Sequence, residues 1–141
     1  MRPRAIVWFE RVLLAALAID LVNNLLAWST LSERVAGEGA AASPTLLLGL
    51  AIAPPLVGLV FWYFIARRRS RVAKWLLAAF VALGVAGFAL VLARSGDVGA
   101  DPMVILAGVS ELMKVVAVAC LFTREASDWL AGGREVEAET P

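Results

Sequence analysis

Three ionisable side chains, Asp20, Glu111 and Lys114, lie inside long apolar runs of this 141-residue chain. Glu111 and Lys114 are three residues apart, a spacing that lets them pair on one helix. A charged group in lipid costs about 2.5–3.5 kcal/mol on insertion scales, so these side chains need partners. Two acids and one base leave one carboxyl in excess, and burial favours the protonated form of that carboxyl. This excess acid is the strongest sequence argument for proton coupling.

The same residues also fit a purely structural role, in which the charges neutralise one another and fix the register of two helices. In lipid, such polar contacts often contribute only about 0.6 kcal/mol each. A third interpretation is a contact with a partner protein. We favour the structural lock over a transport or proton-handling site, and we place the partner contact last.

The elements that must position these residues are four windows of about 20 residues that are almost free of charge. The chain is 61% hydrophobic and 18% charged, with a mean hydropathy of +0.81. A soluble domain is nearer half apolar and a quarter charged. Each window can cross a hydrocarbon core of ~30 Å as a helix that rises ~1.5 Å per residue. The predicted spans are about 6–28, 45–65, 72–92 and 102–122.

Two dipeptides predict where helices begin. Ser43-Pro44 and Asp101-Pro102 each combine an N-cap residue with proline at the first helical position. Between the second and third spans, five cationic residues stand within nine positions: Arg67, Arg68, Arg69, Arg71 and Lys74.

These cations predict the orientation of the chain, because Lys and Arg near span ends accumulate on the cytoplasmic side. The N-terminal segment and the C-terminal flank carry two arginines each, whereas the other two loops carry one each. With four spans, all three basic segments fall on one side. We expect an N-in, C-in, multi-pass protein of the plasma membrane, which is the inner membrane in a bacterium. The basic loop is expected to contact anionic lipid head groups.

Span geometry brings the ionisable residues to one depth. Asp20 lies ~12 Å from the outer end of the first span, and Glu111 lies ~14 Å from the outer end of the fourth. Both positions are near the midplane of a ~30 Å core. On a helical wheel Glu10, Asp20 and Asn24 share one sector, and Ala107, Ser110, Glu111 and Lys114 share another. We expect the two sectors to face each other or a shared cavity, with Asp20, Asn24, Glu111 and Lys114 as a midplane polar cluster.

Pro54-Pro55 lies near the middle of the second span, at almost the same depth. Because proline has no N–H, the pair frees the carbonyls of Leu50 and Ala51 from their usual donors and is expected to kink the helix. A free carbonyl is a good acceptor for an ammonium. We therefore predict a kink at Pro54 and Pro55 and a carbonyl that accepts from Lys114.

The residue inventory argues against an enzyme. The chain has no histidine, the commonest acid–base group and metal ligand, and its single Cys120 cannot form an intrachain disulfide. The sequence shows no nucleophile–base pair, glycine-rich phosphate loop or metal-ligand cluster. Its basic residues border apolar segments instead of alternating with aromatics along a groove, so nucleic acid is not an expected partner. We expect no catalytic residue, no cofactor and no metal.

Together these patterns predict an all-α membrane protein, a bundle of four transmembrane helices. Residues 1–131 form one domain, and 132–141 form a disordered acidic cytoplasmic tail. The first functional hypothesis is a non-enzymatic membrane protein of structural or accessory type. The alternative is a small proton- or cation-coupled transporter or channel that uses the polar cluster. Besides the lipid bilayer, the expected partner is a second copy of the chain or another membrane protein.

Overall fold

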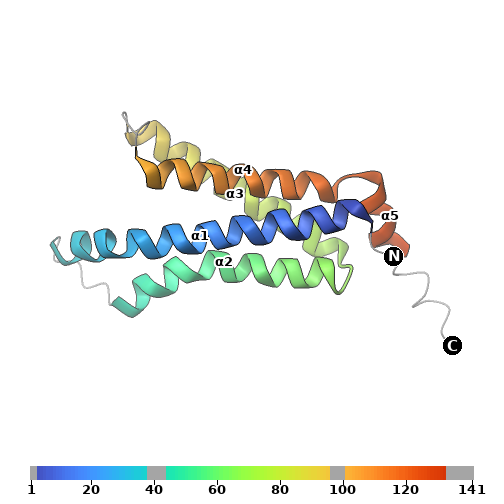
Figure 1. The fold of residues 1–141 in the computed structure, drawn as a ribbon. Helices are drawn as coiled ribbons and strands as arrows, with labels where there is room; N and C mark the ends of the chain where they lie inside the picture. The colour runs from blue at the N-terminus through green and yellow to red at the C-terminus, as the bar shows by residue number, and fades with distance from the viewer. Residues whose placement is uncertain (1–2, 38–43, 96–100, 133–141) are drawn as a thin grey trace.

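The structure, a computed structural model, is described for residues 3–37, 44–95 and 101–132. Within these ranges the chain is helical and has no strand, which confirms the all-α class. In Figure 1 the last described helix, which is the shortest, lies near the N-terminus of the chain. The acidic tail, apart from Gly132, falls outside the described residues. The helices are α1 (Arg4–Gly37), α2 (Pro44–Ala66), α3 (Arg71–Ser95), α4 (Pro102–Leu121) and α5 (Arg124–Gly132).

Local signals set the helix starts. Before α4, the Asp101 carboxylate accepts a hydrogen bond from the Met103 amide at 2.9 Å, and Pro102 occupies the first turn. Before α3, the Ser70 hydroxyl accepts from the Ala73 amide at 3.2 Å. Such side-chain acceptors satisfy amides that have no partner inside the helix. α2, α3 and α4 begin within one residue of the span starts that the sequence predicts, at 45, 72 and 102.

The first helix is longer than the sequence predicts. The sequence predicts a loop from Ser29, and this is wrong, because α1 continues to Gly37. The end of the membrane span at about residue 28 stays a prediction. Segment 29–37 has no proline, and its first glycine is Gly37, so no backbone feature stops the helix earlier. The 34 residues of α1 measure ~51 Å, which exceeds the ~30 Å of a hydrocarbon core.

The sequence prediction also missed α5. Ala126, Trp129 and Leu130 recur at spacings of three and four residues, which is the signal of an amphipathic helix. Ala126 and Leu130 are buried, whereas Glu125 and Asp128 are exposed. A helix of nine residues is marginal in isolation, so α5 depends on its packing against the ends of α1 and α4.

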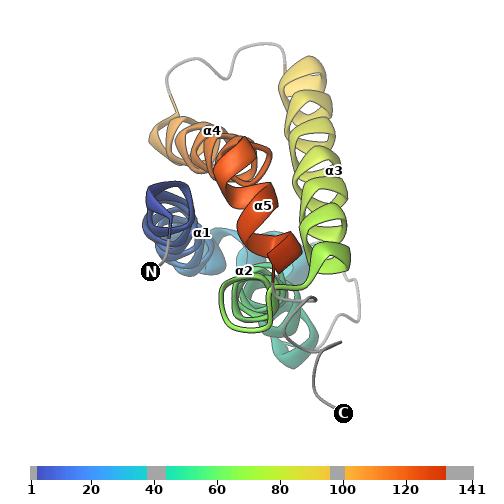
Figure 2. The same cartoon turned by 90° about the vertical axis from the view of Figure 1, so that its right-hand side faces the viewer.

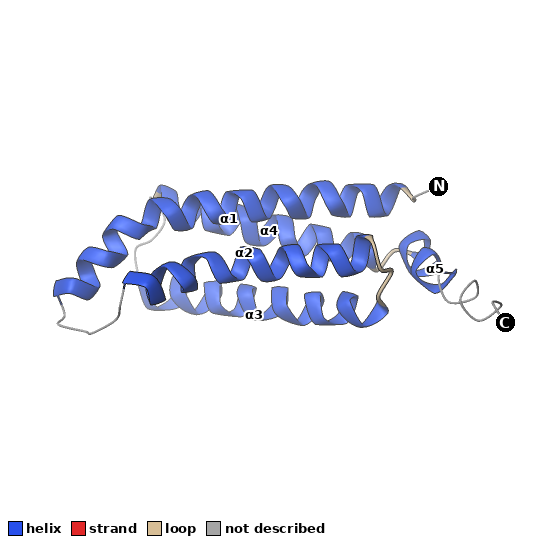
Figure 3. Cartoon of the chain, turned by 90° about the horizontal axis from the view of Figure 1, so that it is seen from below, coloured by secondary structure: helices blue, strands red, loops and turns tan. Residues whose placement is uncertain are grey.

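α1 is central to the packing. It contacts α4 most extensively and α2 next, whereas α3 packs less extensively on α4 and α2. Figure 2 shows α3 inclined to the axes of α1 and α2, and Figure 3 shows the long helices from below. The buried core lies at the end of the molecule that carries the α2–α3 loop. Its largest side chains are Ile6, Phe9, Leu13, Ile65, Leu77 and Leu121.

Gly58 lets α2 approach α1 closely. A Cβ atom at Gly58 would lie 2.5 Å from Cδ2 of the buried Leu17, well inside van der Waals contact. We predict that Gly58→Ala destabilises the protein by about 1–3 kcal/mol, the usual cost of overpacking. Thermal unfolding in detergent measures this change.

Gly49, on the same helix, provides the matched control. A Cβ atom there meets nothing within 4 Å. Gly49→Ala is therefore expected to be neutral or to stabilise by up to about 1 kcal/mol, because alanine loses less backbone entropy than glycine. Equal unfolding temperatures for the two variants would contradict the close approach at Gly58.

Among the residues that the structure describes, two helices are long and apolar enough to cross a membrane, by length and composition: Arg71–Arg94 in α3 and Pro102–Leu121, which is α4. α2 contributes a shorter apolar stretch, Ala51–Ala66. Only 11% of the apolar window in α3 and 22% of that in α4 is buried inside the molecule. Large apolar side chains such as Leu83 and Leu112 are consequently exposed on its surface.

Candidate functional site

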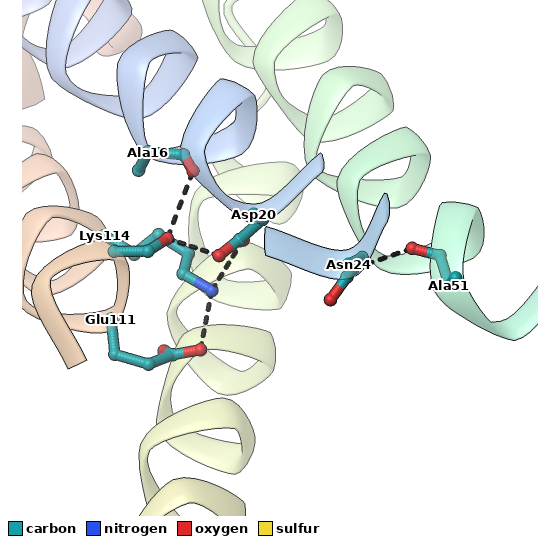
Figure 4. Close-up of polar contacts among 7 residues, drawn as sticks. Ala16, Asp20, Asn24, Ala51, Glu111 and Lys114 are labelled. Carbon is teal, nitrogen blue, oxygen red and sulfur yellow. Dashed lines mark hydrogen bonds and ion pairs between the residues drawn. The ribbon is translucent and has the colours of Figure 1, made fainter. Parts of the chain in front are cut away.

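Lys114 of α4 joins the two acidic side chains that the sequence singles out (Figure 4). Its Nζ lies 3.0 Å from Oδ2 of Asp20 on α1 and 2.6 Å from Oε1 of Glu111 on its own helix. Lys114 is buried, and the side chains of Asp20 and Glu111 are each 18% exposed. We call Asp20, Glu111 and Lys114 the ion-pair triad. The structure thus brings together three of the four residues of the predicted polar cluster.

Ser110 completes this arrangement, although the predicted cluster does not include it. Its buried hydroxyl lies 3.1 Å from the Ala16 carbonyl oxygen and also contacts Oδ1 of Asp20. A serine hydroxyl carries one hydrogen, so it cannot donate a full hydrogen bond to both acceptors at once. The helical wheel placed Ser110 in the sector of Glu111 and Lys114, because four residues separate it from Lys114 and that spacing puts both on one helical face.

Asn24, the fourth predicted member, contacts a different helix. Its Nδ2 donates to the Ala51 carbonyl of α2 at 2.7 Å, as Figure 4 shows. In a helix the carbonyl of residue i accepts from the amide of residue i+4. Because Pro55 has no amide hydrogen, the Ala51 carbonyl is the one that it leaves free. The prediction that Lys114 uses it is wrong, because α1 packs on α2 whereas α4 packs mainly on α1 and α3. α2 continues through Pro54 and Pro55, and the kink stays a prediction.

A cavity of about 350 Å³ adjoins the ion-pair triad. The triad residues share its wall with apolar side chains of α1, α2 and α3, among them Leu17, Pro54 and Phe80. Oε2 of Glu111 is buried and has no hydrogen-bond partner among the described residues. A Cβ atom at Gly84 would lie 3.1 Å from this oxygen, so the glycine keeps the space beside it open. Glu111 therefore lines the cavity while one of its two carboxylate oxygens lacks a donor among the described residues.

The arginines expected to contact lipid head groups lie on the surface. Arg67, Arg68, Arg69 and Arg71 are all exposed. Arg69 has a φ of 49°, in the left-handed region that side chains seldom adopt, and its guanidinium stacks 4.5 Å from the ring centre of Trp129. A cation over an indole ring contributes about 0.5–1 kcal/mol at exposed sites. This stack connects the basic loop to α5.

Lys74, the fifth cation of the loop region, is buried instead. Its Nζ donates to the Ser127 hydroxyl of α5 at 3.2 Å and lies 4.1 Å from the ring centre of Phe122. Trp75 packs edge-on against the same ring, with the ring centres 5.1 Å apart. Lys74 therefore differs from the four arginines in its burial, because α5 covers it whereas the arginines are exposed.

The site combines two carboxylates, an ammonium and a hydroxyl (Asp20, Glu111, Lys114 and Ser110) beside a largely apolar cavity. Such a set can hold a proton or a small cation. Among the residues that the structure describes, no group of three or more His, Cys, Asp and Glu side chains is placed to bind a metal ion. Comparison of the chain with protein-family models, curated proteins and solved structures gave no match.

Proposed function

We propose that the chain is a multi-pass integral membrane protein of non-enzymatic, structural or accessory type. In this proposal α1, α2, α3 and α4 form a bundle that spans the plasma membrane, the inner membrane in a bacterium, with both termini in the cytoplasm. The observation that carries it is the little-buried apolar surface of α3 and α4. The core helix of a soluble protein would be mostly buried. Exposing apolar surface to water costs about 25 cal/mol per Å², and a bilayer removes this cost.

The ion-pair triad supports a structural role within such a bundle. Lys114 contacts both carboxylates, and one of them belongs to the neighbouring helix. Charges in hydrocarbon must be paired, so a shift of α4 along α1 would separate Lys114 from Asp20 and be strongly disfavoured. The triad would therefore fix the register of α1 and α4, as polar residues do at helix interfaces in lipid.

A second candidate function is small proton- or cation-coupled transport, and two observations favour it. The triad holds two carboxyl groups and one ammonium, so it is electrically neutral only when one of the two carboxyls carries a proton. Glu111 lines the cavity, and its Oε2 has no hydrogen-bond partner among the described residues; there the carboxylate could coordinate a cation or accept a hydrogen bond from a water molecule. A cation that binds in the cavity would replace the proton on the triad.

Flux through proteoliposomes separates the two functions. We predict that the purified protein, reconstituted with a pH-sensitive dye inside and a potassium diffusion potential, acidifies the interior no faster than empty vesicles. Monovalent and lipophilic cations are tested in the same way by their uptake. A structural protein shows no flux above the background of the vesicles.

Flux that depends on the triad would contradict the structural role and support transport. In that case Asp20→Asn and Glu111→Gln, which keep the shape of the side chains but exchange no proton, should abolish it. Glu33→Gln is the matched control, because Glu33 is an exposed carboxylate farther along α1. Flux that is lost equally in all three variants would point to damage of the bundle and not to chemistry at the triad.

A further inference from the structure

We infer that Arg71, Lys74 and Ser127 form a binding pocket for one phosphate monoester group, between the start of α3 and α5. A cavity of about 220 Å³ lies there, and its wall includes these three residues together with Trp75 and Leu130. At ~30 Å³ per water molecule this is the space of roughly seven waters. Figure 2 shows α5 beside the first turns of α3, where the Lys74–Ser127 hydrogen bond joins them.

Among the described residues, the positive charge of Lys74 has no carboxylate counter-charge. The residue is 8% exposed. Its ammonium has a hydroxyl partner and an aromatic neighbour, and no carboxylate of the described residues lies within 4 Å of it. A buried charge without a counter-ion is costly, so an anion in the adjoining cavity would stabilise this end of the molecule.

The charges of the pocket select the class of anion. Arg71 adds a second cation one turn before Lys74, and its planar guanidinium matches two oxygens of a phosphate. The acidic residues of α5, Glu125 and Asp128, are exposed and do not line the cavity. Two cations without an acid match a phosphate monoester, which carries about 1.5–2 negative charges at pH 7. A phosphodiester carries only one.

The remaining wall fits a phosphate carried by an organic group. The Ser127 hydroxyl accepts from Lys74 and keeps its own hydrogen for a phosphate oxygen. Trp75 and Leu130 give the other side an apolar character that suits a glycerol or acyl segment. The ligand is either the head group of a lipid or a soluble phosphate monoester. This pocket goes beyond the general attraction of a basic loop for anionic lipid, because it requires Ser127 and excludes Arg67 and Arg68.

Equilibrium binding of a fluorescent phosphatidic acid to the full-length protein in neutral detergent tests the pocket. We expect tighter binding of this monoester lipid than of phosphatidylglycerol, a diester. Arg71→Gln and Lys74→Gln should each weaken binding about tenfold or more, because each removes a charge-assisted hydrogen bond. Ser127→Ala should weaken it by roughly three- to tenfold without changing the charge. Arg68→Gln, which changes the charge as Arg71→Gln does, should stay within about twofold.

A second arm identifies the source of the phosphate. Glycerol 3-phosphate and inorganic phosphate compete with the fluorescent lipid. If these soluble monoesters displace the lipid from the wild type but not from Ser127→Ala, the pocket binds soluble monoesters. If they do not displace it and the lipid still binds as expected, the pocket binds the lipid head group. Equal losses in Arg68→Gln and Arg71→Gln, or equal affinity for the monoester and diester lipids, would overturn the inference. If Lys74→Gln fails to fold, the binding measurements on Ser127→Ala and Arg71→Gln still test the pocket. The result is independent of any flux through the triad.

Discussion

Lys114→Met is expected to lower the free energy of unfolding by about 3–5 kcal/mol, the usual cost of removing one partner from a buried ion pair. The substitution leaves the Asp20 and Glu111 carboxylates facing a cavity with no base between them. Methionine keeps most of the length and apolar volume of lysine, so packing changes little. The loss should appear in unfolding titrations with a denaturing detergent in mixed micelles.

The triple variant Asp20→Asn/Glu111→Gln/Lys114→Met is the control for this result. It removes all three charges and keeps the shapes of the side chains, and the new amide at position 20 would still offer an oxygen to Ser110. Replacing a whole buried ionic group by neutral residues is often neutral or stabilising. We expect it to regain most of the lost stability. A single variant that is as stable as the wild type, or a triple variant as unstable as the single, would show that the charges do not hold α1 to α4.

The contact between the triad residues could be anticipated because the chain offers so few alternatives. Asp20, Glu111 and Lys114 are ionisable groups in long apolar helices, and each must find a partner in the same medium. Their approximate depth follows from counting residues at ~1.5 Å each. The helix starts at Pro44 and Pro102 could also be predicted from the sequence, because a few neighbouring residues decide where a helix begins.

Features that depend on how helices pack could not be read from the sequence. Asn24 and Lys114 were both reasonable donors to the carbonyl that Pro55 frees, and the choice depends on which helix lies beside α2. The cavity beside Glu111 depends on where α3 lies relative to α1, α2 and α4, and no sequence pattern predicts that position. Lys74 was expected on the surface with the four arginines, but α5, which the sequence prediction missed, covers it.

Neutralising the basic residues is expected to change the orientation of the whole chain in the membrane. In the proposed topology nine Lys and Arg residues near span ends lie on the cytoplasmic side, and the two other loops carry one arginine each. Glutamine at the five cationic positions of 67–74 and at Arg2 and Arg4 leaves two on each side. Because this difference sets orientation, the seven-fold variant should insert both ways in comparable amounts. The wild type should insert one way only.

Two C-terminal fusions measure this orientation: a fluorescent protein that matures only in the cytoplasm and a phosphatase active only outside it. The wild type should give fluorescence without phosphatase activity, and the seven-fold variant should give both. The control, Arg34→Gln/Arg94→Gln, removes charge only from the opposite side and should leave the wild-type pattern unchanged. Phosphatase activity in the wild type would place the C-terminus outside and rule out an even number of spans with the N-terminus inside. An unchanged pattern in the seven-fold variant would mean that packing, for example the stack of Arg69 on Trp129 or the apolar contacts of α5, fixes the orientation without the positive charges.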